Sequence, residues 1–290
     1  MIPAAFDYHR PASLDEAVGL LGRYGDEAKV LSGGMSLLPL LKLRLGAFGH
    51  LVDIGSIPGL EYIKEEGGVL KIGGATREAL LDRSELIRTR YPILLDTARV
   101  IADPLVRNRA TVGGNLAHGD PANDHPATML ALSATIVARG PKGERTIPIK
   151  QFFKGLFSTA LAPDEILTEI RIPAPAARSG GAYVKFERKV GDFAIAAAAV
   201  HVTLDAKGAI ERAGVGLTNA GPAPIEAVDA ARFLTGKVPD EAVIAEAGRL
   251  AAAATSPSAD RRGSVQYKQE MARVMVMRAL RKAIQRAGGQ

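Results

Sequence analysis

The sequence predicts an α+β protein with two domains, and three observations support this prediction. Strand-like and helix-like stretches are grouped in the C-terminal part instead of alternating, which favours α+β over a doubly wound sheet. Residues 173–181 are rich in Pro, Ala and Gly with little to bury, which indicates a domain boundary. The 290 residues are enough for two domains of ordinary size. We therefore expect one domain at residues 1–176 and another at residues 177–290.

The start of the chain predicts a small β–α–β unit. Ser13 and Glu16 have the Ser-x-x-Glu form of a capping box, and helical spacing follows until about Gly25. The next elements in order are a buried strand that runs into two glycines, a brief helix and a second strand, at residues 28–34, 36–45 and 50–54.

In the middle part of the chain predicted strands and helices alternate, whereas in the C-terminal part the strands come first and the helices follow. The middle part predicts strands at residues 68–75, 145–153 and 165–173, a mostly helical stretch at 76–101, and a helix leading into a strand at 126–140. The C-terminal part predicts three antiparallel strands at residues 182–189, 194–204 and 209–219, and then helices at 223–234, 240–254 and about 265–286.

Composition argues against nucleic acid and membrane as partners. The net charge is +6, but the positive residues are scattered apart from a cluster near the end, and aromatic residues are only 5% with no Trp. The Arg and Lys residues of the last helix are interpreted as its solvated face, with membrane-surface binding as the alternative. No apolar run approaches the ~18 residues of a membrane span.

Cysteine is absent from the sequence. The chain therefore forms no disulfide, offers no thiolate nucleophile and cannot ligate an iron–sulfur cluster through cysteine. The first residues carry charges where a secretion signal needs an apolar run. Together these features lead us to expect a cytoplasmic location.

Two glycine doublets are the most informative feature, in "VLSGGMSLLPLL" and in "TVGGNLAHGDPANDHPA". Glycine permits positive φ and close backbone approach, and consecutive N–H groups in such a turn can converge on an anion. Hydroxyl and amide side chains flank the doublets at Ser32, Ser36, Thr111 and Asn115. Two such turns would suit the two phosphates of a dinucleotide. The alternative is two tight turns with no ligand.

Other site chemistries fit the residues less well. Neither doublet ends in the Lys-Ser/Thr of a Walker loop or forms G-x-G-x-x-G, which disfavours a standard Rossmann unit. Metal ligands could lie among His118, Asp120, Asp124 and His125, but their spacing matches no known metal motif and local hydrogen bonding explains them better. Asp124 could instead accept hydrogen bonds from ligand hydroxyls. No G-x-S-x-G or triad pattern indicates nucleophilic catalysis, so we assign no catalytic and no metal-ligating residue.

The two glycine motifs resemble those of a known family. "LSGGMSLLPLLKLRL" is similar to the first motif, and "TVGGNLAHGDPANDHPA" to the second, of the FAD-binding medium subunit of molybdenum hydroxylases of the aerobic carbon monoxide dehydrogenase and xanthine dehydrogenase type. "FDYHRPASLDEAVGLL", "DEILTEIRIP", "YVKFERKVGDFAIAAAAV" and "YKQEMARVMVMRAL" match further segments in the same order, so the resemblance covers essentially the whole chain.

The resemblance implies a fold and a set of FAD-binding residues. The fold would be a FAD domain of the vanillyl-alcohol oxidase type with subdomains at about residues 1–55 and 56–176, followed by an α+β domain with a three-stranded antiparallel sheet. By motif position, the residues expected to bind FAD are Val30, Leu31, Ser32, Gly33, Gly34, Met35, Ser36, Leu37, Ile101, Thr111, Val112, Gly113, Gly114, Asn115, Asp124, Leu167, Lys185 and Phe193.

Particular roles follow from the same resemblance. The glycine turns would hold the diphosphate, and Asp124 would contact the ribityl or ribose region. Leu167 and Lys185 match positions that line the flavin pocket, whereas Ile101 and Phe193 match positions near the isoalloxazine ring.

The sequence departs from the family pattern at two positions of the first turn. Met35 replaces a usual Gln and Ser32 a usual Ala. Backbone N–H groups carry that turn, so the departures should not abolish binding. Loss of the Gln amide would cost about 1 kcal/mol. We expect noncovalent FAD, since the first turn has no His or Cys to link it.

The implied function is electron transfer within a heterotrimer, single or doubled. Substrate would be oxidised at a molybdopterin large subunit, and electrons would pass through a small subunit with [2Fe–2S] clusters to FAD on this chain. They would then reach quinone, O2, NAD or another acceptor. The absence of Cys agrees with a separate flavin subunit. Two alternatives remain: a stand-alone FAD-dependent oxidase or dehydrogenase, and a non-catalytic partner-binding module that has lost FAD.

Overall fold

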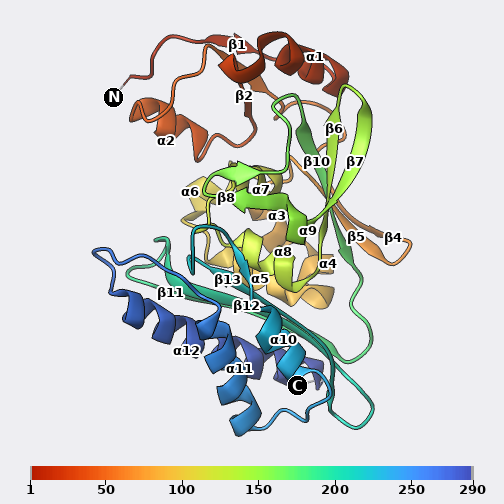
Figure 1. The fold of residues 1–290 in the computed structure, drawn as a ribbon. Coiled ribbons are helices and arrows are strands. Elements are labelled where there is room, and N and C mark those ends of the chain that lie inside the picture. The colour runs from red at the N-terminus through yellow and green to blue at the C-terminus, as the bar shows by residue number, and fades with distance from the viewer. Residues whose placement is uncertain (1, 289–290) are drawn as a thin grey trace.

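Three β-sheets, each with helices packed beside it, make up most of the chain (Figure 1). The computed structural model describes residues 2–288. Figure 1 shows the N-terminal unit, the middle sheet and the C-terminal sheet following one another along the molecule. No helix in the described range has the length and apolarity needed to cross a membrane.

The N-terminal unit confirms the predicted β–α–β arrangement. Its elements are β1 (Asp7–His9), α1 (Leu14–Tyr24), β2 (Ala28–Leu31), α2 (Leu37–Lys42) and β3 (His50–Asp53). The strands form a parallel sheet in the order β1-β3-β2, in which β1 was not predicted. Helix α1 begins where expected, because the Ser13 hydroxyl accepts the Glu16 N–H at 3.2 Å and the Glu16 carboxylate accepts the Ala12 N–H at 2.8 Å.

The middle sheet is antiparallel, with the order β4-β5-β10-β6-β7. Its strands are β4 (Ile63–Glu66), β5 (Val69–Gly73), β6 (Thr135–Gly140), β7 (Gly143–Pro148) and β10 (Ile166–Pro173). Strand β4 was missed by the sequence analysis. It forms a hairpin with β5 across Gly67 and Gly68, which have φ values of 58° and 74° that favour glycine.

The predicted helical stretch at 76–101 is divided into α3 (Glu78–Arg83), α4 (Glu85–Arg90) and α5 (Pro92–Arg99). Ser84 ends the first helix and caps the second, accepting the Ile87 N–H at 3.3 Å. Pro92 starts the third, where its missing N–H is not needed. Three more helices follow before β6: α6 (Pro104–Arg107), α7 (Val112–His118) and α8 (His125–Ala131).

The predicted strand at 145–153 was wrong beyond Pro148. After β7 the chain turns through α9 (Ile149–Phe152) into a small hairpin of β8 (Phe153–Gly155) and β9 (Ser158–Thr159). Ile149 and Phe152 are both buried in the central hydrophobic core. Burial of two residues three apart suits one helical turn better than the alternating faces of a strand.

The C-terminal sheet has four antiparallel strands, where the sequence predicted three. They are β11 (Ser179–Glu187), β12 (Ala194–Leu204), β13 (Ile210–Thr218) and β14 (Ile225–Glu226). Residues 225–226 were assigned to a helix, but they pair with Leu217 and Gly216, and α10 (Val228–Leu234) starts after them. Two more helices, α11 (Glu241–Ala253) and α12 (Val265–Ala287), complete this part.

Strand β12 is buried on both faces, which joins the C-terminal sheet to the middle part. Ala197 and Ala199 belong to the core shared with α5 and α8, whereas Ala198 and Val200 belong to the core formed with α11 and α12. This alternation places helices on both sides of the sheet, as Figure 1 shows. Asp96 of α5 adds ion pairs to Lys282 at 3.0 Å and Arg286 at 2.6 Å of α12.

Helix α8 lies unusually close to β13. A Cβ on Gly214 or Gly216 would collide with the carbonyl oxygens of Ala131 and Ala127, respectively. Glycine at these positions therefore allows the helix to rest on the strand backbone. The position of α8 also sets that of Asp124, an expected FAD-binding residue, which immediately precedes the helix.

The close packing of α8 on β13 can be tested by Gly216→Ala. The added Cβ has backbone as its neighbour, so the variant should lower the free energy of unfolding by about 1–3 kcal/mol. Gly22→Ala is the matched control, because Gly22 lies in α1 with no neighbouring atom within 4 Å and should gain about 0.5–1 kcal/mol. Urea unfolding measures both, and equal stabilities for the two variants would contradict the proposed packing.

Candidate functional site

The two glycine motifs, far apart in the sequence, lie in contact. The hydroxyl oxygens of Ser32 and Thr111 are 2.9 Å apart and share a hydrogen bond. Gly33 lies so close to the backbone at Arg109 that a Cβ would collide with the Arg109 carbonyl oxygen. The structure therefore brings together the two segments that the sequence analysis singled out.

The first motif is a loop with free backbone donors. It follows β2 at Ser32 and leads into α2, and Gly34 has a φ of 76°, which favours glycine. Its carbonyl groups are used, since Gly34 accepts from Leu38 at 3.0 Å and Ser36 accepts from Leu40 at 3.2 Å. Within residues 2–288, no protein acceptor takes the N–H groups of residues 32–36. These donors can bind an anion.

The second motif is the first turn of α7, which corrects the expectation of an open glycine turn. The Thr111 hydroxyl caps the helix, accepting the Gly114 N–H at 3.1 Å. The Val112 and Gly113 N–H groups donate to Thr76 and Gly74 at 2.9 and 3.1 Å. A Cβ on Gly113 would collide with the Gly74 carbonyl oxygen. This doublet thus packs α7 against the end of β5, and its N–H groups are already used.

Asn115 supplies a polar group that the protein leaves unsatisfied. Its backbone N–H donates to Thr111 at 2.9 Å, and its carbonyl accepts from the Asn123 side chain at 2.7 Å. The side-chain oxygen Oδ1 is buried and has no hydrogen-bond partner among the described residues. A buried polar atom of this kind usually has a partner, which a bound ligand could provide.

Asp124, Tyr183 and Lys185 form a buried polar cluster where the start of α8 meets β11. Asp124 accepts the Tyr183 hydroxyl at 2.5 Å through Oδ1 and the Lys185 ammonium at 3.1 Å through Oδ2. Lys185 also donates to the Val100 carbonyl at 3.0 Å. Burial raises the pKa of Asp124, while Lys185 and Tyr183 act in the opposite direction. Burial, followed by the charge of Asp124, raises the pKa of Tyr183.

The remaining candidate residues occupy different environments. Ile101 is buried and its carbonyl accepts from Arg107 at 2.9 Å. Leu167 is buried in β10, and its backbone touches Gly74, which in turn contacts Gly113. Phe193, by contrast, is 50% exposed at the end of the loop between β11 and β12. Val30 and Leu31 at the end of β2 and Leu37 at the start of α2 border the first loop, and Met35 lies within it.

The histidines and aspartates of the second motif contact other groups of the protein. His118 packs against Phe157 with ring centroids 5.0 Å apart, and burial lowers its pKa. Asp120 accepts the Ala122 N–H at 2.8 Å. His125 and Glu78 are fully buried, with Nε2 and Oε2 2.7 Å apart. Within the described residues, no three His, Cys, Asp or Glu side chains form a group that could hold a metal.

The sequence analysis missed Tyr183 and Glu78. Tyr183 and Lys185 are two positions apart in β11 and so share one face of the sheet, which is a signal that could have linked them. Glu78 gives no such signal, because an acidic residue at the first position of a helix is ordinarily solvated. Only the tertiary structure places it against His125.

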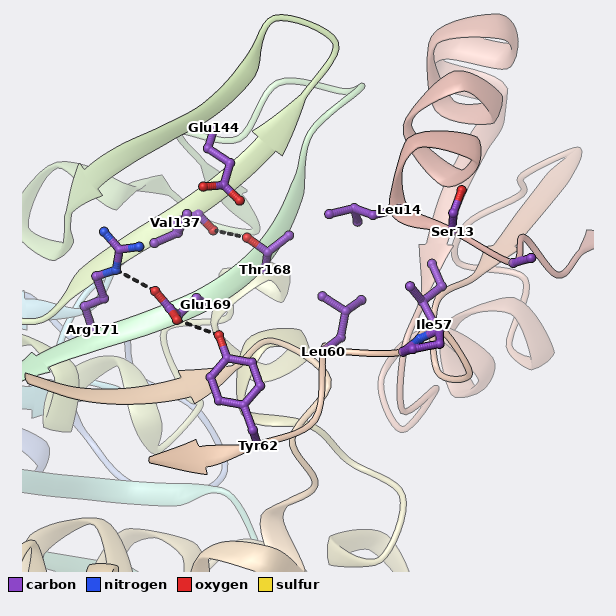
Figure 2. Close-up of a pocket in the computed structure, with 13 residues that line it drawn as sticks. Ser13, Leu14, Ile57, Leu60, Tyr62, Val137, Glu144, Thr168, Glu169 and Arg171 are labelled. Carbon is purple, nitrogen blue, oxygen red and sulfur yellow. Dashed lines mark hydrogen bonds and ion pairs between the residues drawn. The ribbon is translucent and has the colours of Figure 1, made fainter. Parts of the chain in front are cut away.

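A cavity of about 450 Å³ lies elsewhere, between the start of α1 and the middle sheet (Figure 2). Tyr62 and Arg171 both bond to Glu169 there, each at 2.5 Å, and Leu14 and Leu60 face the same space. None of the expected FAD-binding residues lines this cavity. The contact between the glycine motifs, together with the free amides, is therefore the better guide to the cofactor site.

Comparisons with known proteins identify the family of this chain. Residues 4–175 match the family described as "FAD binding domain in molybdopterin dehydrogenase", and residues 181–283 match "CO dehydrogenase flavoprotein C-terminal domain". The chain is 44% identical to the carbon monoxide dehydrogenase medium chain of Afipia carboxidovorans over 99% of both chains. It is 39% identical to 6-hydroxypseudooxynicotine dehydrogenase complex subunit alpha of Paenarthrobacter nicotinovorans, over 99% of this chain and 97% of that one.

The fold is shared as well. The structure of carbon monoxide dehydrogenase from Hydrogenophaga pseudoflava, in the form that lacks the Mo-pyranopterin moiety, contains a chain with a TM-score of 0.95 and 46% identity, covering 98% of both chains. These matches span both domains and confirm the resemblance seen in the sequence. The chain therefore belongs to the family of FAD-binding medium subunits of molybdenum hydroxylases, and it is an FAD-carrying oxidoreductase subunit.

Proposed function

We propose that this chain binds FAD where its two glycine motifs meet, and passes electrons from a [2Fe–2S] subunit to an external acceptor. The observation that carries the proposal is the contact between Ser32 and Thr111 beside the free N–H groups of residues 32–36. A diphosphate needs several donors converging from one side, and this loop offers them.

The hydrogen bonds of the two motifs suggest a different role in FAD binding for each. The first loop would bind the diphosphate through backbone N–H groups. The second motif would contribute side chains, with Thr111 holding Ser32 in place and Asn115 Oδ1 accepting from a ligand hydroxyl or amide. Gly114 faces Ser32 across this junction, since a Cβ added at Gly114 would lie 3.8 Å from the Ser32 Cβ. Residues 30–37 and 111–115 thus stay the proposed cradle.

The polar cluster at the domain junction would contact the flavin end of the cofactor. An ionised carboxylate has about four lone-pair sites, so Asp124 can still accept from ligand hydroxyls after bonding to Tyr183 and Lys185. Lys185 brings a buried positive charge to the same place. The contacts of Ile101 and Phe193 near the isoalloxazine ring, and the place of Leu167 in the lining of the flavin pocket, stay predictions from the family resemblance.

FAD supplies the redox chemistry when it is bound, and the protein supplies its position and electrostatic surroundings. Since the chain has no Cys, the iron–sulfur clusters that feed the flavin would lie on a separate small subunit, and a molybdopterin large subunit would oxidise the substrate. Quinone, O2 and NAD are the candidate acceptors. A heterotrimer in the cytoplasm, with two FAD subdomains of the vanillyl-alcohol oxidase type and boundaries near residues 55 and 176, completes the proposal.

Purification with the cognate subunits tests this function. Co-expression should yield a complex of three different chains with flavin absorbance, and denaturation should release FAD without leaving flavin attached to this chain. A colourless complex that cannot be reconstituted with FAD would indicate a binding module without cofactor. Turnover of a substrate by this chain alone would instead indicate a stand-alone flavin enzyme.

The contact between the motifs can be tested with Ser32→Ala, Thr111→Val and the double variant. Ser32→Ala should weaken FAD binding about 5-fold, because it removes one hydrogen bond of about 1 kcal/mol. Thr111→Val should weaken it about 10-fold, because it also removes the cap of α7. The double variant should lose less than the sum, since both changes remove the same bond. Flavin fluorescence titration of reconstituted protein measures the affinities.

Ser84→Ala is the matched control for this series, because Ser84 caps α4 as Thr111 caps α7. It should lower stability by about 1 kcal/mol and leave FAD affinity unchanged. Strictly additive effects of the Ser32 and Thr111 variants on affinity would mean that their contact does not serve the cofactor.

The role of Asp124 is separable from its contribution to domain packing. Asp124→Asn should weaken FAD binding at least 10-fold, because the amide cannot accept as many hydrogen bonds and leaves Lys185 short of a partner. Asp96→Asn also removes a carboxylate that joins the two domains; Asp96 binds Lys282 and Arg286, and it meets Tyr183 only at the backbone N–H, at 3.4 Å. The Asp96 variant should reduce stability without changing FAD affinity; equal losses of affinity would make Asp124 a structural residue only.

A further inference from the structure

A fully buried acid–base pair, Glu78 and His125, joins the start of α3 to the start of α8. The two side chains meet through Oε2 and Nε2, 2.7 Å apart, and neither is exposed at all. Their other polar atoms, Glu78 Oε1 and His125 Nδ1, are buried without a hydrogen-bond partner within residues 2–288. A buried pair that is only partly satisfied stabilises a fold less than apolar side chains of similar size would. The pair is therefore better explained by the positions that it fixes than by the stability that it adds.

The backbone of Glu78 is attached to the second glycine motif. Its N–H donates to the Ala110 carbonyl at 2.9 Å, and the preceding residue, Arg77, forms a β-bridge with Thr111. Thr111 caps α7 and shares a hydrogen bond with Ser32 of the first loop. The acid of the buried pair thus stands on the backbone that holds Thr111 in place.

His125 carries the other end of the pair to Asp124, which it follows directly in the chain. The turn before α8 is also tied to α7, because the Asn123 side chain donates to the Asn115 carbonyl at 2.7 Å. The contacts therefore form a closed ring that runs through α7, the start of α8, the buried pair and the start of α3. This ring fixes Asp124 relative to Thr111, because a shift of either residue would break a hydrogen bond within it.

The buried pair also adds a charge next to Asp124. Asp124 binds the Lys185 ammonium at 3.1 Å, and His125 binds the Glu78 carboxylate at 2.7 Å. When His125 carries a proton, positive and negative groups alternate through the two pairs. Burial raises the pKa of Asp124, whereas its two partners in β11 and then His125 lower it. The pair thus favours the ionised carboxylate that can accept hydrogen bonds from ligand hydroxyls.

We propose that Glu78 and His125 are positioning residues for FAD binding, which fix Asp124 relative to the second glycine motif through one buried hydrogen bond. This inference rests on the proposed function, because Asp124 and residues 111–115 are both parts of the proposed FAD site. Neither residue of the pair has to touch FAD. Their effect is on the spacing of groups that do, and on the charge of Asp124.

FAD titration of the complete complex, after removal of its flavin, tests the proposal. Glu78→Gln keeps a hydrogen bond to His125 without the negative charge, so its FAD affinity should stay within about 3-fold of wild type. Glu78→Leu combined with His125→Leu removes the bond and leaves no buried polar group, so this double variant should keep a urea midpoint close to wild type. It should bind FAD about 10-fold or more weakly, because Asp124 is no longer fixed.

Thr97→Val is the matched control. Thr97 in α5 and Thr128 in α8 are fully buried as well, and their hydroxyl oxygens share a hydrogen bond at 2.7 Å. The change removes a buried bond that holds the same helix α8, but not at the residue next to Asp124. Its urea midpoint should fall, because the Thr128 hydroxyl loses a partner, and its FAD affinity should equal that of wild type.

Three results would overturn the proposal. These are wild-type FAD affinity in the double variant, an equal loss of affinity in Thr97→Val, and a loss in Glu78→Gln as large as in the double variant. Asp124→Asn separates this inference from the proposed function. Weak binding by Asp124→Asn beside normal binding by the double variant refutes the positioning role alone. Normal binding by both refutes the proposed contact of Asp124 as well.

Hydrogen–deuterium exchange on the wild-type complex gives a second measurement that needs no variant. If the ring transmits strain between α3 and the cofactor, FAD should slow exchange in α3, at residues 78–83, as well as at residues 32–36 and in α7. Exchange in α11, at residues 241–253, should not change. Protection at residues 32–36 without protection in α3 would contradict the positioning role, whereas no protection at residues 32–36 would contradict the proposed function.

Discussion

The close approach of two backbone segments, at the first glycine motif and the second, is the constraint on which the proposed cofactor site depends. Gly33 lies against the Arg109 carbonyl and Gly113 against the Gly74 carbonyl, at distances that exclude any side chain. Through these contacts the N-terminal sheet, the middle sheet and α7 meet at one point. The Ser32–Thr111 hydrogen bond then sets the position of the first loop relative to the second motif. The donors of residues 32–36 stay free only because the packing is done by other groups.

Hydrogen bonds between polar side chains also join α8 to the C-terminal sheet. Asp124 stands at the start of α8, and its carboxylate binds Tyr183 and Lys185 from the C-terminal sheet. Gly214 and Gly216 let α8 lie on β13, so Asp124 is placed by helix packing as well as by its own hydrogen bonds. A carboxylate and an ammonium buried together are costly unless each has several partners, and here each has them. The proposed cofactor contact and the packing of α8 on the C-terminal sheet thus share one polar cluster.

Much of the fold could be predicted from local patterns. The capping box at Ser13, the β–α–β unit, the long strands of the C-terminal sheet and the helix at 265–287 all appear where periodicity and capping residues indicate them. The errors fall where local signals are ambiguous. Strands β4 and β14 are short and gain their stability from pairing with distant or glycine-linked neighbours. The stretch at 76–101 looks continuous in helical pattern, but Ser84 and Pro92 each start a new helix.

For the candidate site, the sequence by itself determined which residues can take part: two polar-flanked glycine doublets and no cysteine. It also determined the family, because the resemblance runs along the whole chain, and the comparisons confirmed it. Only the tertiary structure decided which amides are free, because a backbone N–H shows its partner only when the chain is folded. In the folded chain the second doublet lies in the first turn of α7, whereas the first doublet lies in a loop whose N–H groups have no acceptor within residues 2–288. It also brought Tyr183 to Asp124, since burial and long-range contact are properties of the packed chain and not of any local stretch of residues.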